Sequence, residues 1–167
     1  MRLPWPAAGA SAVLVVFGVI GLIRGAVPQG VASGGATSGS APIVVSGAYV
    51  RPPVPPTNVA AAYFTVYNTT AKDDTLTSVS TGAGASAVLH TEVNGVMSAV
   101  SGGVVVPAHG SLVLSTGTGH VMISQLFGTL RPGQTVNLLL NFANAGEVTV
   151  VAPVIALGAA APTGATK

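Results

Sequence analysis

The 167-residue sequence contains no cysteine, and this absence removes several kinds of chemistry at once. Disulfide bridges, thiolate zinc sites, cysteine nucleophiles and an N-terminal lipidated cysteine all need a thiol. Methionine sulfur and imidazole nitrogen are the remaining ligands that a soft metal ion would use.

Charged residues are scarce as well, at 6% of the chain. Between residues 43 and 160, three basic side chains stand against four acidic ones, so this part is close to neutral. These are Arg51, Lys72 and Arg131 against Asp73, Asp74, Glu92 and Glu147. We therefore expect no basic surface for nucleic acid. The apolar fraction of 49% also excludes charge-rich disorder.

The usual catalytic constellations are missing too. Glu92 and Glu147 are the only glutamates, and Asp73 and Asp74 share one loop, so no facing pair of carboxylates is predicted. No GxSxG motif occurs, and the TGTG before His120 lacks the lysine and the following helix of a phosphate loop. We expect that the protein is not an enzyme.

The two ends of the chain differ in composition from its middle. Residues 1–24 hold an uncharged apolar run, 7–23, between Arg2 and Arg24, which predicts a signal peptide or a signal-anchor helix. Either alternative places the rest outside the cytoplasm, in the periplasm or on the outer face of the membrane. Residues 25–42 are predicted to be a flexible Gly/Ser-rich linker, and residues 158–167 a disordered tail.

The middle of the chain, residues 43–157, consists of short β-rich runs separated by turn residues. Strands are expected at 43–51, 60–68, 75–81, 87–93, 96–100, 120–126, 134–142 and 147–157, with two more inside 104–116. Such spacing without helical periodicity predicts an all-β domain, an antiparallel sandwich or small barrel.

Histidine and methionine, both rare here, cluster in this domain. Apart from the initiator methionine, all of them lie within residues 90–122. His120 and Met122 are two residues apart and share one face of a strand. His90 and Met97 flank an Asn-Gly turn, a strong hairpin signal that can bring them together. Two imidazoles and two thioethers favour Cu(I).

A structural interpretation of the same residues stays open. Methionine often fills cores of β proteins, and a histidine in a strand is often a half-buried surface residue. His109 lies between a proline and a glycine in VPAHGS, which indicates a turn residue rather than a ligand. Glu92, two residues after His90, is either a plain surface residue or an acceptor that orients an imidazole.

Three stretches of residues 47–154 resemble the periplasmic copper chaperone family PCuAC. They are AYVRPPVPPTNVAAAYFTVYNTT, LHTEVNGVMSAVSGGVVVPAHGSLVL and GHVMISQLFGTLRPGQTVNLLLNFANAGEVTVVAPV. The resemblance implies a cupredoxin-like β-sandwich that binds Cu(I) through His90, Met97, His120 and Met122. Six residues separate His90 from Met97, fewer than in the family, and Ala99 stands where members often have a second methionine.

The resemblance also implies a role in copper delivery. The expected acceptor is the copper-centre subunit of a respiratory haem-copper oxidase, or another copper chaperone, reached by a membrane-tethered or exported carrier. The alternative is a structural or accessory β-sandwich module of a membrane protein complex that binds no metal.

Overall fold

The computed structural model describes residues 41–163, so the signal or anchor segment predicted for residues 1–24 and nearly all of the linker lie outside the described residues. The described part contains ten strands and no helix, which confirms the all-β class. In this part of the chain, accordingly, no helix is long and apolar enough to span a membrane.

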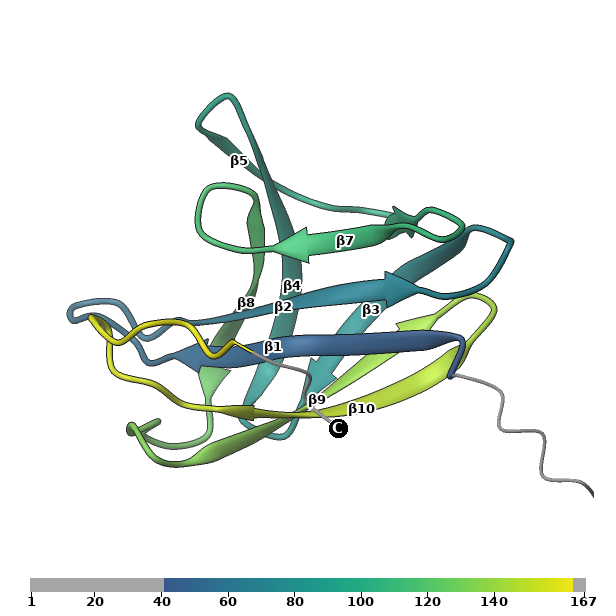
Figure 1. The fold of residues 1–167 in the computed structure, drawn as a ribbon. Helices are drawn as coiled ribbons and strands as arrows, with labels where there is room; N and C mark the ends of the chain where they lie inside the picture. Colours follow the sequence, from purple (N-terminus) through teal and green to yellow (C-terminus); the bar gives the residue numbers. More distant parts are fainter. Residues whose placement is uncertain (1–40, 164–167) are drawn as a thin grey trace, which may run out of the picture. The chain divides into compact units, whose positions relative to one another are not determined.

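The strands form two antiparallel sheets (Figure 1). The first sheet has the order β1 (Ile43–Arg51), β2 (Ala60–Asn68), β8 (Gly119–Leu126), β4 (Gly84–Val93) and β5 (Val96–Ala99), and β7 (Ser111–Leu114) also pairs with β2. The second has the order β10 (Gly146–Pro153), β9 (Thr135–Phe142), β3 (Asp74–Thr81) and β6 (Val104–Val106). Strand β8 thus lies between two strands that are distant from it in the sequence.

The core is built by strict alternation along the central strands. Phe64 on β2, Val121 and Ile123 on β8, and Leu138 and Leu140 on β9 are at most 1% exposed. Burying a side chain of this size stabilises the fold by roughly 1.5–3 kcal/mol. Because successive strand residues point to opposite faces, the residues between them, including every second residue of β8, face outward.

The two edges of the first sheet differ. Beside β1, the end of the chain adds a parallel bridge between Val50 and Val154, and the Ile155 N–H donates to the Val50 carbonyl at 3.0 Å. Arg51 also donates to the carbonyls of Ala156 and Ala159. At the other edge, all four residues of β5 are exposed. The β1 edge is therefore covered, and the β5 edge is open to solvent.

The last strand is shorter than expected from the sequence. We predicted a strand over residues 147–157, but β10 ends at Pro153. Val154 bridges β1, while its own N–H still donates to the carbonyl of Gln134, just before β9, at 2.8 Å. The apolar run 154–157 is thus part of the segment that covers β1.

A buried carboxylate holds one end of the second sheet together. Asp74 accepts hydrogen bonds from the backbone N–H groups of Thr75 at 2.7 Å and of Asn144 and Ala145 at 2.9 Å. Burial alone would raise the pKa of Asp74, but these hydrogen bonds outweigh it and lower the pKa. The acidic side chain is therefore structural, and it fixes the turn between β9 and β10.

Candidate metal centre

His90 and His120 are direct neighbours across two strands. The antiparallel register of β4 and β8 places His90 opposite His120. Their rings are stacked, with centroids 5.6 Å apart and planes 18° from parallel. Both side chains are half-buried on the outward face of the first sheet, away from the core. Two imidazoles from distant parts of the sequence are therefore brought together by strand pairing.

Met122 lies on the same outward face as His120, as the two-residue spacing on β8 requires. Its cross-strand neighbours are Val88 on β4 and Ala61 on β2, both small. Met122 is half-buried, and it lies two residues from His120 on this face. These two histidines and this methionine are three neighbouring candidate ligands of two uncharged types, imidazole and thioether.

Met97 lies apart from the group. In the β4–β5 hairpin, Glu92 pairs with Met97, whereas His90 pairs with Ala99. Met97 is therefore a diagonal neighbour of His90 on the same face, at about 7–8 Å between Cα atoms. Met97 is 51% exposed and does not point into the core. The hairpin thus sets Met97 one rung from His90 on the same sheet face, so the two residues are diagonal rather than direct neighbours.

The two methionines stand on opposite sides of the histidine pair. Along β8, Met122 follows His120 toward the Val88 rung, while Met97 is on the Glu92 rung in the other direction. Four residues along a strand correspond to about 13 Å. Both sulfurs can approach one ion only if it lies over the histidine pair and Met97 reaches inward from the edge.

The electrostatics of the pair favour a neutral His120 ring. Burial is the largest cause that lowers the pKa of His120, the nearby His90 lowers it further, and Glu92 partly offsets both. The His90 Nδ1 atom is 3.2 Å from the Val88 carbonyl oxygen. When Nδ1 carries the proton and donates to that carbonyl, the lone pair on Nε2 is available to a metal. Glu92 is half-buried on the His90 face and influences His120 through its charge.

Two tyrosines, which sequence reasoning missed, extend the histidine row. Tyr63 on β2 lies against His120, with centroids 5.9 Å apart and planes at 49°. Tyr49 on β1 stacks on Tyr63 at 5.0 Å, and the Arg51 guanidinium lies 5.3 Å from the Tyr49 ring centroid. The outward position of Tyr63 follows from the alternation of β2, but its contact with His120 depends on non-local pairing of β2 with β8.

Gly119 is a third residue that sequence reasoning missed. A Cβ atom at this position would lie 2.5 Å from the backbone carbonyl oxygen of His90, far inside van der Waals contact. Only glycine therefore lets β8 approach β4 at the rung next to the histidine pair. In the sequence the TGTG stretch indicated only that no phosphate loop is present.

His109 is a turn residue, as expected. It is exposed between β6 and β7, with a φ of 52°, and its N–H donates to the Thr70 carbonyl at 3.0 Å. Its turn precedes Ser111, which pairs with Tyr67 near the end of β2 that is remote from Ala61 and Met122. His109 therefore does not join the histidine pair.

Hard-metal chemistry finds little support in residues 41–163. This region has no group of three or more His, Cys, Asp or Glu side chains arranged to hold a metal ion. His90, His120 and Met122 present uncharged imidazole and thioether groups, and ligands of these types suit Cu(I).

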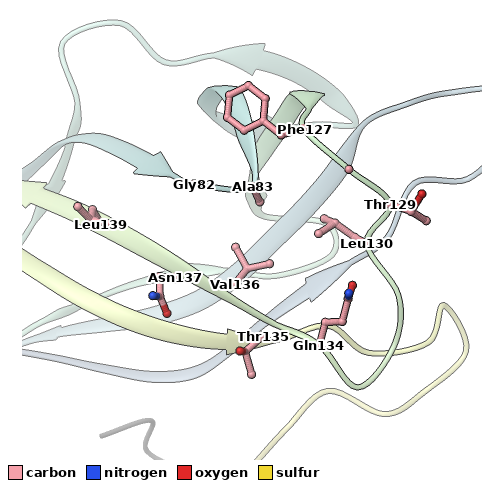
Figure 2. A pocket seen from close by; sticks show the side chains of 11 residues that line it. Gly82, Ala83, Phe127, Thr129, Leu130, Gln134, Thr135, Val136, Asn137 and Leu139 are labelled. Atoms are coloured by element: carbon pink, nitrogen blue, oxygen red, sulfur yellow. The ribbon is translucent and has the colours of Figure 1, made fainter.

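A cleft elsewhere on the domain has a different character. It has a volume of about 470 Å³ and is lined by residues such as Phe127, Leu130, Gln134 and Val136 (Figure 2). None of its lining residues is a histidine, a methionine or a charged residue. The cleft therefore has no imidazole or thioether side chain for a soft metal ion, and the histidine pair stays the candidate centre.

Known proteins resemble the chain in fold and in part of its sequence. The LpqE-like family model, whose description is "Putative lipoprotein LpqE-like", matches residues 43–154. The solution structure of Cu(I)-DR1885 from Deinococcus radiodurans is 30% identical, with a TM-score of 0.59, and the match covers 72% of this chain and 83% of that one. Among curated proteins, none matches the chain significantly.

Two PCuAC domains show the same fold. The apo PCuAC domain from PmoF1 is 25% identical, with a TM-score of 0.62, and the match covers 69% of this chain and 94% of that domain. The copper-bound PCuAC domain from PmoF2 is 23% identical, with a TM-score of 0.60, and coverage is 69% and 93%. Because the family match spans more than half of the 167 residues, the chain belongs to the LpqE-like family of PCuAC-type domains.

Proposed function

We propose that the domain is a Cu(I) carrier that works outside the cytoplasm. The observation that carries the proposal is the stacked His90–His120 pair with Met122 beside it on an outward sheet face. His90, His120 and Met122 would bind one Cu(I) ion, and Met97 would join as the fourth ligand from the hairpin. The copper-bound states of PmoF2 and DR1885 support the choice of metal.

The ligand chemistry suits a metal that is carried and then released. Thioether and neutral imidazole bring no negative charge, so the soft Cu(I) ion is bound without burial of a thiolate. The lowered pKa of His120 keeps this ring unprotonated near neutral pH. Because the ligands are half-buried or exposed, an acceptor's ligands can reach the ion from the side where Met97 lies. We propose no catalytic role.

The location and the acceptor are further parts of the proposal. Export is supported by the apolar run 7–23 and by the description of the family as lipoproteins. These 167 residues contain no cysteine for lipid attachment, so an anchor helix in residues 1–24 would provide any tether. The proposed acceptor is the copper-centre subunit of a haem-copper oxidase or another copper chaperone.

The test is a titration of the purified chain with Cu(I) against a competing chelator. We expect one bound ion, and a loss of affinity of more than about 100-fold in the His120→Ala, Met122→Ala double variant, since even changes behind the ligands cost 10- to 100-fold. The matched control is His109→Ala, which removes an exposed histidine remote from the pair. Wild-type binding no tighter than that of the double variant would defeat the carrier proposal.

A metal-free accessory module is the second candidate, and the position of Met97 favours it. Met97 lies one rung away from His90 and at an exposed edge, so the four-ligand set is not assembled in the described structure. If the same titration shows no specific site, the open β5 edge becomes the surface of interest. A specific site that depends on His120 and Met122 excludes this candidate.

A further inference from the structure

We propose that Tyr63 is a positioning residue for the candidate centre, which holds the His120 imidazole against His90. The expected effect of Tyr63 on Cu(I) affinity rests on the proposed function. Its effect on the position of the His120 imidazole can be measured in the metal-free protein. Tyr63 is not itself a proposed ligand. It acts on His120 from the side opposite His90.

Strand register places four rings in one row across the sheet. β1 pairs Tyr49 with Tyr63, and β4 pairs His90 with His120. β2 and β8 pair Ala62 with Val121, so the next rung of the same antiparallel ladder sets Tyr63 beside His120. The ring distances along the row are 5.0, 5.9 and 5.6 Å. The His120 ring therefore stands between the Tyr63 ring and the His90 ring.

The Tyr63 ring is itself held from two directions. Tyr49 stacks on it with planes 22° apart, and the Thr116 side chain, in the loop before β8, lies near enough to the Tyr63 hydroxyl to lower its pKa slightly. Burial and the neighbouring Tyr49 raise the pKa of Tyr63, so the hydroxyl stays protonated at neutral pH. Arg51, which lies over Tyr49, closes the outer end of the row. The ring is thus a fixed wall rather than a free surface side chain.

A fixed wall beside His120 restricts its rotamers. A strand histidine has several staggered positions, and those that turn the ring toward β2 collide with Tyr63. His120 therefore keeps its ring close to His90 before any metal arrives. Holding one side chain in its bound rotamer in advance contributes roughly two- to ten-fold in affinity. The same contact shields one side of the imidazole from water.

The experiment compares Tyr63→Leu and Tyr63→Phe with a matched control, Tyr67→Leu. Tyr67 lies on the same face of β2, is 45% exposed and pairs with Ser111 rather than with the histidine row. The first measurement is made on the metal-free full chain by NMR, through the contact between the His90 and His120 ring protons and the side-chain order of His120. The second is Cu(I) affinity in the chelator competition.

We expect Tyr63→Leu to weaken the ring–ring contact and to lower Cu(I) affinity roughly two- to ten-fold. Tyr63→Phe, which keeps the ring and loses the hydroxyl, should restore most of both, and Tyr67→Leu should change neither. Thermal unfolding identifies any variant that fails to fold. In that case Tyr49→Leu, which loosens Tyr63 without touching His120, takes the place of Tyr63→Leu with a smaller expected effect.

An unchanged His120 ring position and unchanged affinity in folded Tyr63→Leu overturn the positioning role. Equal loss in Tyr67→Leu also overturns it, because the effect would then be a general one of this sheet face. A wild-type chain without a specific Cu(I) site defeats the proposed function instead, and the metal-free NMR comparison still decides whether Tyr63 positions His120.

Discussion

The predicted ligands come from two regions that differ in how firmly the fold holds them. Strand β8, with His120 and Met122, is paired on both sides, by β2 and by β4. The β4–β5 hairpin carries Met97 on an edge strand that has one partner and four exposed residues. A residue on a strand that is paired on both sides has little backbone freedom, whereas an edge strand opens more easily. One half of the site is rigidly placed, and the other half is adaptable.

This difference suits a carrier that must both retain and release a metal. The β8 half would keep the ion oriented, and the exposed hairpin half would be the side on which ligands exchange. The exposed apolar residues Val93 and Val96 border Met97 at the hairpin tip, which leaves that side without charge apart from Glu92. The predictions below break or sharpen this comparison, from the largest expected effect to the smallest.

Removing one sulfur from each region compares the two halves directly. We expect Met122→Ala to lower Cu(I) affinity by about 100-fold and Met97→Ala by less than about tenfold, because Met97 must leave its exposed position to bind. Chelator competition on the two variants measures both losses. Equal losses would show that the hairpin is as well placed as β8 in the bound state.

A methyl group at Gly119 tests the contact between the two regions. In Gly119→Ala the new Cβ meets the His90 carbonyl oxygen at 2.5 Å, so β4 and β8 must separate beside the histidine pair. Overpacking of this kind costs about 1–3 kcal/mol of unfolding free energy. Urea unfolding of the metal-free protein measures it, with Gly117→Ala, where a Cβ meets no atom within 4 Å, as the neighbouring control. Gly117 has a φ of 88°, so Gly117→Ala loses stability through backbone strain without a clash. The stability loss of Gly119→Ala is measured against this loss.

A methionine directly opposite His90 should give the hairpin a thioether that is better placed for Cu(I) than Met97. Ala99 is the direct cross-strand partner of His90 and is exposed, so Ala99→Met places a thioether on the histidine rung without displacing core residues. We expect about a tenfold gain in Cu(I) affinity, and a smaller effect of Met97→Ala in this background. A double-mutant cycle of Ala99→Met and Met97→Ala measures whether the new sulfur takes the place of the Met97 sulfur in binding. No gain in affinity from Ala99→Met would mean that an ion bound by the β8 side chains is out of reach of a ligand on β5.

Acid should weaken the histidine pair in the metal-free protein. The pKa of His120 is lower in the folded than in the unfolded state, so the unfolded state binds the proton more readily below about pH 6.5. Stability therefore falls as pH falls through the His120 window, while Asp74 loses its contribution only below its usual value of 3.8. Denaturation at pH 7.5 and 5.5 tests this, with His120→Gln expected to reduce the difference. A pH slope that is unchanged in this variant would assign it to other groups.

Local pattern was sufficient for much of the fold. The strands expected at residues 43–51 and 60–68 are β1 and β2 with the same bounds, because alternation and flanking turns mark both ends. The shared face of His120 and Met122 follows from the two-residue period of a strand. The hairpin register was also accessible, since the two-residue turn at Asn94 and Gly95 pairs His90 with Ala99. Counting residues outward from this turn pairs Met97 with Glu92, so Met97 is not on the same rung as His90.

The sequence by itself determined most of the strands, the outward face of β8 and the chemical type of the candidate ligands, because each depends on residues close together in the chain. Only the tertiary structure decided that β8 inserts between β2 and β4, which brings His120 to His90 on one side and to Tyr63 on the other. Pairing between distant strands depends on burial of the opposite face and on close approach at Gly119. Neither condition is visible in a local pattern, since both are set by the packing of the whole domain.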